Sequence, residues 1–475
     1  MTTNRMKQKA DDLRHKIRGA VLIPGDAAYE DARRVWNAMV DRRPAVIVRC
    51  AEAADVATGI AFARENQLDI SVRGGGHHIG GHSVCDDGLM IDFSAMKDVQ
   101  VDSSTQRALV WPGATLADFD RAVQAYGMAT PVGINSTTGI AGLTLGGGFG
   151  WLTREYGMTV DNLMAADVVL ADGKKVRASE NENPDLFWGI RGGGGNFGVV
   201  TQFEFKLHHV GPTVFAGLFV FPLEEAPQVL DRYREFVQSA PRNLNVWAVL
   251  RKAPPLPFLP ADLHGSEVLV LAVFYNGATV DGERLIQPFR RFGNLLGEHV
   301  GPMPYSQWQQ AFDPLLTPGA RNYWKSHNLT ELSDGAMNTM IEYADRLPSA
   351  HCEIFLALVA GAANEVSPGA TAYSARDARF VINVHARWEA ANQDDECIGW
   401  ARAFFNKAAP YASSGAYTNF MTADESERVP VAYGANYARL LEIKQRYDPE
   451  NVFHLNQNIR RAKQDFRGKT QQRTA

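Results

Sequence analysis

The chain has few cysteines and no long apolar run, and both absences narrow the classes of protein to which it can belong. Its four cysteines are scattered, without the close spacing of a structural zinc site or a disulfide framework. No apolar stretch reaches the roughly 18 residues that a membrane-spanning helix needs. Residues 1–18 carry charges throughout and lack the apolar core of a secretory signal. We therefore expect a cytoplasmic protein with no membrane partner and no metal site.

An excess of positive charge is also missing. The 475 residues include 48 Lys and Arg against 53 Asp and Glu, a formal net charge of −5. Because a nucleic-acid-binding protein needs a basic stripe to meet the phosphates, nucleic acid is excluded as the expected partner. A chain of this length is too long for one ordinary core, so at least two domains are expected. Glycine, by contrast, is plentiful: many of its 42 residues gather at 74–81, 142–150 and 192–198.

The first glycine cluster follows a predicted strand. Residues 68–73 alternate apolar and polar side chains, and the strand they predict runs directly into Gly74-Gly75-Gly76-His77-His78. Consecutive glycines adopt backbone conformations that other residues avoid, so such a loop can turn successive N–H groups toward a phosphate. A histidine directly after the loop would meet whatever the phosphate carries. From this segment alone, a flexible turn followed by two surface histidines is an equal alternative.

The third glycine cluster raises the question of a Rossmann dinucleotide-binding fold. The spacing of Gly193, Gly195 and Gly198 formally matches the fingerprint of that fold. The fingerprint works only where a strand precedes it and a helix follows. Here residues 199–205 follow, and their β-branched and aromatic side chains predict a strand. The sequence therefore argues against a nicotinamide-dependent Rossmann enzyme.

Two patterns predict helices next to these clusters. Thr115-Leu116-Ala117-Asp118 resembles a capping box, and the helix it begins is expected to stop at Gly127. Residues 433–447 form an amphipathic pattern, which predicts a helix that ends at Asp448-Pro449. From about residue 210 the glycine clusters cease and strand and helix patterns alternate, as expected for a second α+β domain that shapes a pocket.

Four separated stretches together resemble the berberine bridge enzyme-like family of flavin oxidases, whose flavin domain is of the vanillyl-alcohol oxidase type. In chain order they are Arg73 to His77, residues 139–157, residues 183–198 and residues 433–458. The last stretch is close to the family's pattern of Tyr, Gly, Asn-Tyr, Arg-Leu, Lys, Tyr-Asp-Pro, Asn-Val-Phe and Asn-Gln. The four stretches extend over nearly the whole chain in the family's order, and the middle region matches least.

The resemblance implies a particular α+β architecture. Its first part is an FAD-binding domain of the PCMH or vanillyl-alcohol oxidase type, made in two pieces from residues 1–210 and 421–475. Its second part is an inserted α+β substrate domain, residues 211–420, with an antiparallel sheet covered by helices. That domain would lie over the isoalloxazine ring of FAD.

The resemblance also implies how FAD is held. His77 would be joined covalently to the flavin 8α-methyl group, because a neutral imidazole nitrogen is a competent nucleophile for that bond. His78 is the alternative if the loop is displaced by one residue. The residues expected to bind the cofactor come from the glycine clusters and the C-terminal pattern: Arg73, Gly74, Gly75, Gly76, His77, His78, Asn135, Thr138, Gly139, Gly142, Gly146, Gly148, Gly150, Gly195, Asn196, Gly198, Val200, Asn456 and Asn458.

One segment departs from the better-known members of the family. Many of them attach the flavin a second time, through a cysteine in a segment like Cys-Pro-Thr-Val-Gly. The matching residues here are 135–139, and Asn135 stands where that cysteine would be. We therefore expect a single covalent bond, through His77, and no cysteinyl link. The departure also weakens any inference of the wide oligosaccharide-binding groove that the family associates with a doubly linked flavin.

Flavin oxidation of an alcohol or amine needs a group that takes the substrate's proton. Tyr417, in a segment that resembles the family's Tyr-x-Asn, is the first candidate; a half-buried tyrosine with a satisfied hydroxyl is the alternative. Because a free phenol is a poor base at neutral pH, a nearby cation or hydrogen-bond donor must favour the phenolate. Residues 380–388 alternate as one strand with Asn383, His385 and Arg387 on one face. Asn383 and His385 are candidates for orienting the substrate or tuning Tyr417, unless they belong to an ordinary polar face.

The function that the resemblance implies is oxidation of a small alcohol, sugar, phenolic or alkaloid-like substrate, with hydride transfer to flavin N5. O₂ would then reoxidise the flavin and give H₂O₂. Thr138 stands at the position that the family links to oxygen access, and threonine is nearly isosteric with valine, which favours an oxidase. A dehydrogenase with another acceptor and a flavin-carrying binding protein without turnover are the alternatives. We expect a monomer or a homodimer.

Overall fold

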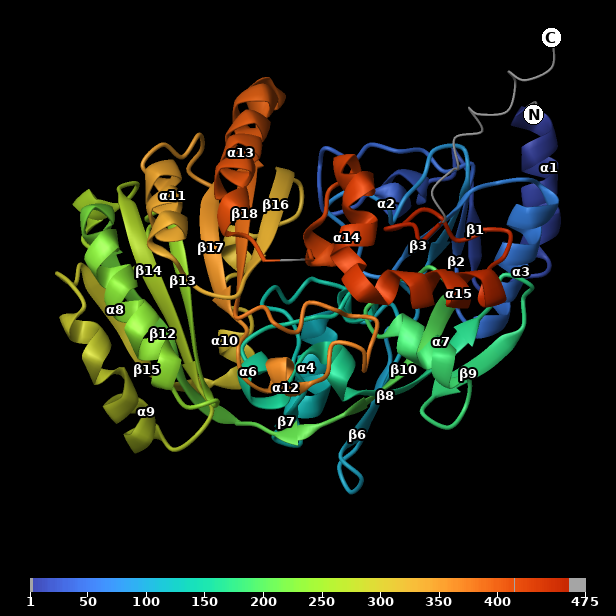
Figure 1. Ribbon diagram of the computed structural model, residues 1–475. Coiled ribbons are helices and arrows are strands. Elements are labelled where there is room, and N and C mark those ends of the chain that lie inside the picture. The colour runs from blue at the N-terminus through green and yellow to red at the C-terminus, as the bar shows by residue number, and fades with distance from the viewer. Residues whose placement is uncertain (1–2, 414, 461–475) are drawn as a thin grey trace, which may run out of the picture.

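The computed structural model describes residues 3–413 and 415–460, and its N-terminal half carries two sheets (Figure 1). The first has the order β1-β2-β4-β3, in which β1 (Ala20–Leu22) is antiparallel to β2 (Val46–Arg49), and β4 (Leu89–Asp92) is parallel to both β2 and β3 (Ile70–Arg73). The second is antiparallel and has the order β5-β6-β10-β8-β9, with bounds Val99–Asp102, Arg107–Val110, Val199–Lys206, Leu163–Val169 and Lys175–Ser179. A ribbon of β7 (Met128–Ala129) and β11 (His208–His209) follows them.

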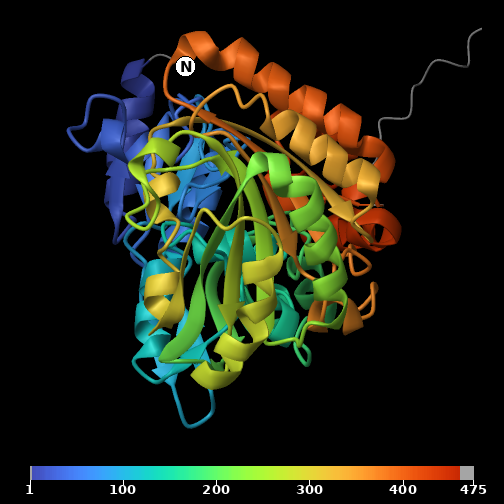
Figure 2. The ribbon, with the colours of Figure 1, turned by 90° about the vertical axis from the view of Figure 1, so that its left-hand side faces the viewer.

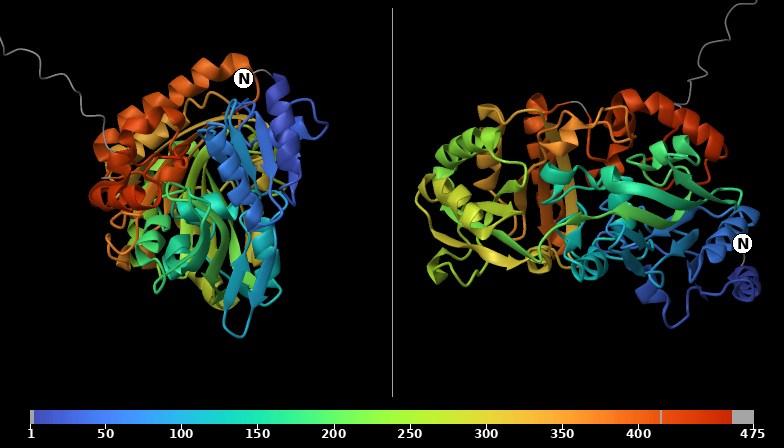
Figure 3. Two further views of the ribbon diagram at one scale, coloured as in Figure 1. Left: turned by 90° about the vertical axis from the view of Figure 1, so that its right-hand side faces the viewer. Right: turned by 90° about the horizontal axis from the view of Figure 1, so that it is seen from below.

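A third, larger sheet contains seven antiparallel strands, all between Thr213 and Trp388. Its order is β15-β12-β14-β13-β17-β18-β16, with bounds Gly297–Pro304, Thr213–Pro222, Glu267–Tyr275, Leu244–Lys252, Glu353–Leu358, Phe380–Trp388 and Arg321–Leu329. Figure 3 shows this sheet and its helices on one side of the molecule and the two smaller sheets on the other. The predicted domain boundaries at 210 and 420 stay predictions.

Helices cover one face of the seven-stranded sheet and leave the other face toward the smaller sheets (Figure 2). The covering helices are α8 (Ala226–Ser239), α9 (Thr279–Ile286), α11 (Asp334–Ala344) and α13 (Asp394–Ala408). Both faces are therefore covered along the central strands, and every residue of β18 is buried, including its polar ones. Since buried polar groups need partners, β18 is the strand on which polar side chains are most informative.

Shorter helices organise the N-terminal half. They are α1 (Thr3–Arg14), α2 (Tyr29–Arg33), α3 (Ala53–Glu65), α4 (Leu116–Gln124), α5 (Ile140–Leu145), α6 (Thr153–Tyr156) and α7 (Pro184–Ile190). The predicted capping box at α4 is confirmed: the Asp118 N–H donates to Thr115 Oγ1 at 3.2 Å, and the Thr115 N–H donates to Asp118 Oδ2 at 3.1 Å. The helix ends before Gly127, whose φ of +62° fits the predicted stop.

The C-terminal segment returns to the N-terminal half and packs beside it (Figure 1). The predicted helix over 433–447 is wrong at its start: α14 (Val429–Tyr433) ends at Gly434, whose φ is +51°, and α15 spans Tyr437–Tyr447. Lys444 on α15 is buried, and its Nζ donates to Asn196 O and Phe453 O, each at 2.8 Å, and pairs with Asp448. This cation therefore ties residues 444–453 to the third glycine cluster.

Two further helices, each of four residues like α6, are α10 (Tyr305–Trp308) and α12 (Ala362–Glu365). The strand predicted after Gly198 is confirmed as β10, and the strand predicted over 380–388 is confirmed as β18. Within residues 3–413 and 415–460, no helix has both the length and the apolar character to cross a membrane.

Candidate active site

A cleft lies between the N-terminal half and the open face of the seven-stranded sheet. One side, here called the glycine wall, is mostly backbone and comprises Gly74, Gly75, Gly76, Gly139, Gly142, Gly146, Gly194, Gly195 and Gly198. The other side, here called the aromatic wall, comprises Phe149, Trp247, Trp324, Phe355 and Phe420. Histidines and residues 453–457 of the returning C-terminal segment complete the lining. The cleft therefore joins segments that are far apart in the sequence.

The first glycines of the wall are required by contact between two backbones. A Cβ on Gly75 would lie 2.3 Å from the amide nitrogen of Gly139, and one on Gly74 would lie 2.9 Å from the carbonyl oxygen of Pro112. Gly76 follows with a φ of +73°, a conformation that favours glycine. The loop after β3 can therefore pack directly against the segment before α5 only because neither carries side chains.

Other glycines of the wall face open space. A Cβ added to Gly142 or Gly195 would meet no atom within 4 Å. Three buried polar atoms beside this space have no hydrogen-bond partner in the described part of the chain: Ser83 Oγ, Tyr433 Oη and Asn456 Oδ1. Because buried polar groups are normally satisfied, these atoms indicate a missing polar ligand. A flat cofactor with phosphate and hydroxyl groups, such as FAD, fits both the room and the unsatisfied groups.

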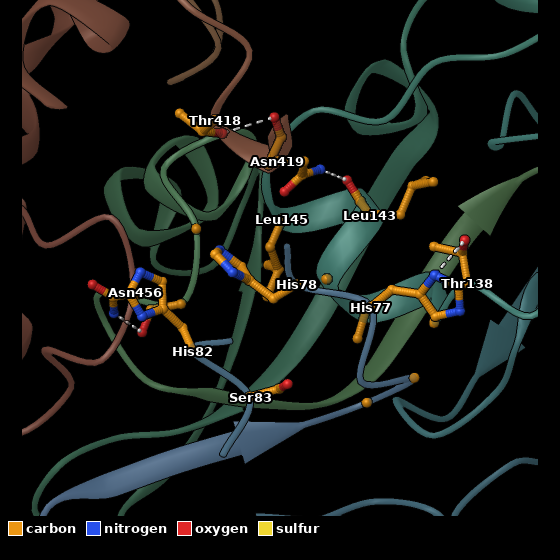
Figure 4. Close-up of a pocket in the computed structure, with 18 of the residues that line it drawn as sticks. His77, His78, His82, Ser83, Thr138, Leu143, Leu145, Thr418, Asn419 and Asn456 are labelled. Carbon is orange, nitrogen blue, oxygen red and sulfur yellow. Dashed lines mark hydrogen bonds between the residues drawn. The ribbon is translucent and has the colours of Figure 1, made fainter. Parts of the chain in front are cut away.

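His77 lies on the edge of the cleft with its ring nitrogens facing the hydroxyls of Thr137 and Thr138, the second of which is shown in Figure 4. Its Nε2 lies 2.9 Å from Thr137 Oγ1, and its Nδ1 lies 3.5 Å from Thr138 Oγ1. The Thr137 hydroxyl donates its own proton to Asn135 Oδ1 at 2.7 Å, so its oxygen accepts from His77. This pattern assigns the proton of the neutral ring to Nε2 and leaves the lone pair on Nδ1. Burial lowers the pKa of His77 to about 3, so the imidazole is neutral.

His78 and His82 form a second pair on the same cleft, and sequence reasoning did not find the role of His82. Their ring centroids are 4.5 Å apart, and both line the cleft, with Asn456 beside His82 (Figure 4). Burial lowers the pKa of His82 to about 4 and that of His78 below its usual range. Both rings are therefore neutral near pH 7 and can act as hydrogen-bonding groups without adding charge.

Tyr417 lies between the two walls. Its hydroxyl oxygen accepts hydrogen bonds from the Gly148 N–H and from Asn419 Nδ2, each at 3.1 Å. The two donors that a phenolate would need are thus present, but burial dominates and raises the pKa of Tyr417 to about 12. Phe420 separates Tyr417 from His385, with ring centroids 4.7 and 6.5 Å away respectively. The structure therefore gives no direct contact by which His385 would tune Tyr417.

A row of charged side chains crosses the open face of the seven-stranded sheet. Arg251 on β13 lies opposite Glu353 on β17, which in turn lies opposite His385 on β18. The Arg251 guanidinium is 2.6 Å from Glu353 Oε2, and His385 Nδ1 is 3.1 Å from Glu353 Oε1. Burial raises the pKa of Glu353, but Arg251 and His385 outweigh it and hold that pKa below its ordinary value. Glu353 is therefore a carboxylate that orients His385.

Asn383, which does not line the cleft, contacts the last side chain of this row, His385. Its Nδ2 donates to His385 Nε2 at 2.8 Å, which fits a neutral ring with its proton on Nδ1. Asn383 Oδ1 is buried and has no partner among the described residues. His385 lines the cleft, whereas Asn383 does not, and the His385 ring stacks on Trp324 with centroids 4.1 Å apart.

The aromatic wall encloses the space beyond His77 and Tyr417. Trp247 stacks on Phe355, and Phe420 contacts Phe149 and Trp324 edge to face. The indole N–H groups of Trp247 and Trp324 are buried and have no acceptor in the part of the chain that the structure describes. Aromatic residues on strands are as often plain core, so the sequence by itself does not single out this wall. The wall thus offers aromatic faces and two free donors.

Comparison with known proteins identifies the family. The family model described as an FAD-binding domain matches residues 44–179, and the model described as berberine and berberine-like matches residues 416–460. An FAD-linked oxidoreductase of Dictyostelium discoideum is 31% identical over 457 residues, which cover 95% of this chain and 97% of that protein. The chain belongs to the berberine bridge enzyme-like family of FAD-linked oxidoreductases.

Solved structures of this family confirm the predicted fold class. The chain superposes on 6-hydroxy-D-nicotine oxidase from Arthrobacter nicotinovorans with a TM-score of 0.83, at 27% identity and over 94% of this chain and 98% of that one. It superposes equally, with a TM-score of 0.83 at 23% identity and over 97% and 98% of the two chains, on a glucooligosaccharide oxidase from Acremonium strictum. The latter is described with a 6-S-cysteinyl, 8α-N1-histidyl FAD, and at that identity the likeness shows the fold alone.

In this berberine bridge enzyme-like chain, most of the predicted site residues line the cleft. They are Gly74, Gly75, Gly76, His77, His78, Asn135, Thr138, Gly139, Gly142, Gly146, Gly195, Gly198, Val200, Asn456, Tyr417 and His385. Residues of the lining that sequence reasoning passed over include Ser83, Thr418, Tyr433 and Gln457. Their signal was weak, because none belongs to a glycine cluster and each is an ordinary polar or aromatic residue.

Six predicted site residues lie outside the cleft lining. Arg73 pairs with the buried Asp92 and donates to Arg34 O, so its role is to hold β3 and β4 together. Asn196 Nδ2 donates to Gln457 O at 3.1 Å, and Asn196 Oδ1 accepts from Ile459, which fixes the C-terminal segment. Gly148 and Gly150 are close to Thr159 and to the Val132 carbonyl, where a Cβ would not fit. Asn458 and Asn383 also stand away from the lining.

Proposed function

We propose that this protein is an oxidase that carries FAD on a single covalent bond to His77, oxidises a small aromatic alcohol or amine, and passes the electrons to O₂. The observation that carries the proposal is a neutral imidazole at the edge of a cleft whose glycine wall has open positions with unsatisfied polar groups beside them. When bound, FAD would accept two electrons from the substrate and return them to O₂ as H₂O₂.

The single linkage through His77 is supported by the positions of the cysteines. All four are buried, and none of them lines the cleft: Cys50, Cys85, Cys352 and Cys397. Asn135, at the position of the family's second attachment, accepts from Thr137 through Oδ1 and donates to Leu316 O at 3.3 Å through Nδ2. The assigned tautomer of His77 makes Nδ1 the nitrogen with a free lone pair, and we propose Nδ1 as the linking atom.

We propose separate roles in substrate oxidation for Tyr417 and His385. Tyr417, with its pKa raised to about 12, keeps its proton near pH 7 and donates a hydrogen bond to an oxygen or nitrogen of the substrate. His385, whose Nδ1 and Nε2 are held by Glu353 and Asn383, lines the cleft with its ring and would help to position the substrate. Trp324 beneath the ring keeps the imidazole in place.

The aromatic wall supports a planar aromatic substrate over an oligosaccharide. Sugars are bound through many hydroxyl contacts, whereas this wall presents ring faces and two indole N–H donors. The relation to a 6-hydroxynicotine oxidase, which by its name acts on an aromatic heterocycle, is in line with this choice. We also propose a cytoplasmic location, the predicted domain division and a monomer or homodimer.

Three measurements test the proposal. Ultraviolet fluorescence of the denatured chain on a gel, followed by peptide mass mapping, should place all of the covalent flavin on the His77 peptide. Anaerobic bleaching of the flavin is then screened with benzylic alcohols, N-heterocyclic amines and cello-oligosaccharides, and the aromatic compounds should bleach it. In air, one H₂O₂ should form for each substrate molecule consumed.

Each alternative has its own outcome. Bleaching without H₂O₂ in air would identify a dehydrogenase that uses another acceptor. A flavin that no compound bleaches would identify a binding protein without turnover. A flavin on any cysteine peptide would contradict the single bond, and bleaching by the oligosaccharides alone would contradict the aromatic substrate.

A further inference from the structure

Trp36 is a buried aromatic residue beside the flavin-attachment loop, and no motif points to it. It lies in the segment between α2 and β2 and stacks on the imidazole of His77, with ring centroids 5.0 Å apart and planes 23° apart. Its side chain is only 4% exposed and is not part of the cleft lining. Trp36 therefore contacts the attachment histidine from outside the space that a cofactor would occupy.

The position of Trp36 is fixed by contacts to both halves of the molecule. Its backbone N–H donates to the carbonyl of Gly76, the residue before His77, at 3.1 Å. Its indole N–H donates to Leu316 O at 3.0 Å, and the Gly319 N–H donates to its carbonyl at 3.2 Å. The indole thus connects the loop after β3 with the segment that leads into β16.

A cation holds the same indole. The guanidinium carbon of Arg387 on β18 lies 5.3 Å from the centroid of the Trp36 ring, a distance typical of a cation–π contact. Arg387 is itself held by Thr317, whose carbonyl accepts from Nη2 at 2.6 Å. Arg387 is buried, so its contact with Trp36 is weakly screened by solvent. Removal of either partner would free the indole to move.

Two restraints of different kinds then act on the His77 ring. The Trp36 face limits rotation of the imidazole out of its plane, while Thr137, anchored by Asn135, holds Nε2–H within the plane. Both restraints leave the lone pair on Nδ1, which the Thr138 hydroxyl approaches only to 3.5 Å. Covalent attachment depends on such alignment, since a misplacement of about 1 Å between reacting atoms can cost on the order of 100-fold in rate.

We propose that Trp36 is the positioning residue for covalent attachment of the flavin at His77, and that Thr137 acts with it. In that step, Nδ1 of His77 forms a bond to the 8α carbon as a C–H bond of the methyl group breaks. The methyl carbon and Nε2 of the imidazole each release a proton, and the two electrons reduce the flavin before they pass to O₂. The inference rests on the proposed His77 linkage.

The arrangement also makes attachment depend on the substrate half of the molecule. Arg387, Thr317 and Leu316 all belong to the region of the seven-stranded sheet, yet they hold the indole that orients His77. Attachment is therefore expected to be slow in a variant whose cleft is loaded with FAD but whose Trp36 contacts are lost.

The test measures the rate of attachment rather than turnover. Flavin-free protein from riboflavin-depleted cells is mixed with excess FAD in air, and the fluorescence of the denatured chain and the mass of the His77 peptide are followed with time. Trp36→Leu is expected to slow attachment at least roughly tenfold, and Trp36→Phe, which keeps an aromatic face, is expected to stay within about threefold of the parent. Thr137→Val should slow attachment, and Thr137→Ser should restore it.

Matched controls separate positioning from packing. Arg387→Met should slow attachment, whereas Arg346→Met, which removes a guanidinium 4.3 Å from the Tyr343 ring far from the cleft, should not. Non-covalent FAD binding and thermal unfolding are measured on each variant. If Trp36→Leu does not fold, the inference is tested by the attachment rates of Trp36→Phe, Thr137→Val and Arg387→Met. Equal attachment rates in folded, FAD-loaded variants and parent would overturn the inference. A parent protein without flavin on His77 would instead overturn the proposed linkage.

Discussion

The two walls of the cleft are built by different means. The glycine wall is made from backbone. The loop after β3 packs directly against the segment before α5 because the glycines at this contact have no side chains. The aromatic wall and the charged row are made from side chains that come from four strands and from the two segments that carry Phe149 and Phe420. A wall made from backbone can be recognised in the sequence, because it requires clustered glycines. A wall made from side chains cannot, because its hydrophobic and polar residues resemble those found elsewhere in the chain.

The largest expected effect tests the charged row. Glu353→Gln leaves the Arg251 guanidinium buried without a counter-charge, and loss of one partner of a buried pair costs about 3–5 kcal/mol of unfolding free energy. Because the folded state lowers the pKa of Glu353, the contribution of its charge exists above about pH 4.3 and is lost as the pH falls through the lower folded value. Urea unfolding of parent and variant at several pH values measures both effects. A difference that persists unchanged at the acid end would contradict the pairing.

The second prediction tests the glycine wall. Gly75→Ala places a Cβ 2.3 Å from the Gly139 nitrogen, so the two backbones must separate, and a loss of about 3 kcal/mol with weaker FAD binding is expected. Gly399→Ala is the matched control, because its Cβ would meet no atom within 4 Å on helix α13. That control should be stabilised by about 1 kcal/mol through helix propensity. Thermal unfolding and FAD titration check both, and equal behaviour of the two variants would refute the close-contact argument.

The third prediction tests Tyr417, which lies between the walls. Tyr417→Phe removes the hydroxyl that the structure leaves protonated, and the rate of anaerobic bleaching by an active aromatic substrate should fall by about 100-fold. His385→Gln leaves the Tyr417 hydroxyl in place and should lower this rate less, because His385 is assigned to positioning of the substrate. An unchanged rate in Tyr417→Phe, or a larger loss in His385→Gln, would reverse the assignment of the two roles.

The smallest expected effect concerns one unsatisfied atom beside the glycine wall. Ser83→Ala removes a buried hydroxyl that has no partner in the described chain and is expected to meet the cofactor. Loss of one such hydrogen bond costs about 1 kcal/mol, which corresponds to roughly fivefold weaker non-covalent FAD binding in a His77→Ala background. Fluorescence titration measures it. Unchanged affinity would mean that the hydroxyl faces water instead of FAD.

Much of the fold followed from local patterns. The capping box at Thr115, the stop at Gly127 and the strand after Gly198 depend on residues close in sequence, and all three were predictable. The start of the last helix was predicted wrongly, because the amphipathic pattern runs through Gly434 while its left-handed backbone interrupts the helix. Arg73 and Asn196 were expected at the cofactor because they adjoin glycine clusters. Their partners, Asp92 and Gln457, are visible only after the chain has folded.

By itself, the sequence determined the family, the mixed α+β fold, the glycine loops and His77 as the candidate anchor, since each depends on residue types at short spacing. Only the tertiary structure decided what surrounds His77 and the substrate. Trp36 meets His77 across 41 positions, and Arg251, Glu353 and His385 meet across three strands that are separated in sequence by long connections. Such contacts depend on strand order and on how the two halves pack, and neither is encoded in any local pattern.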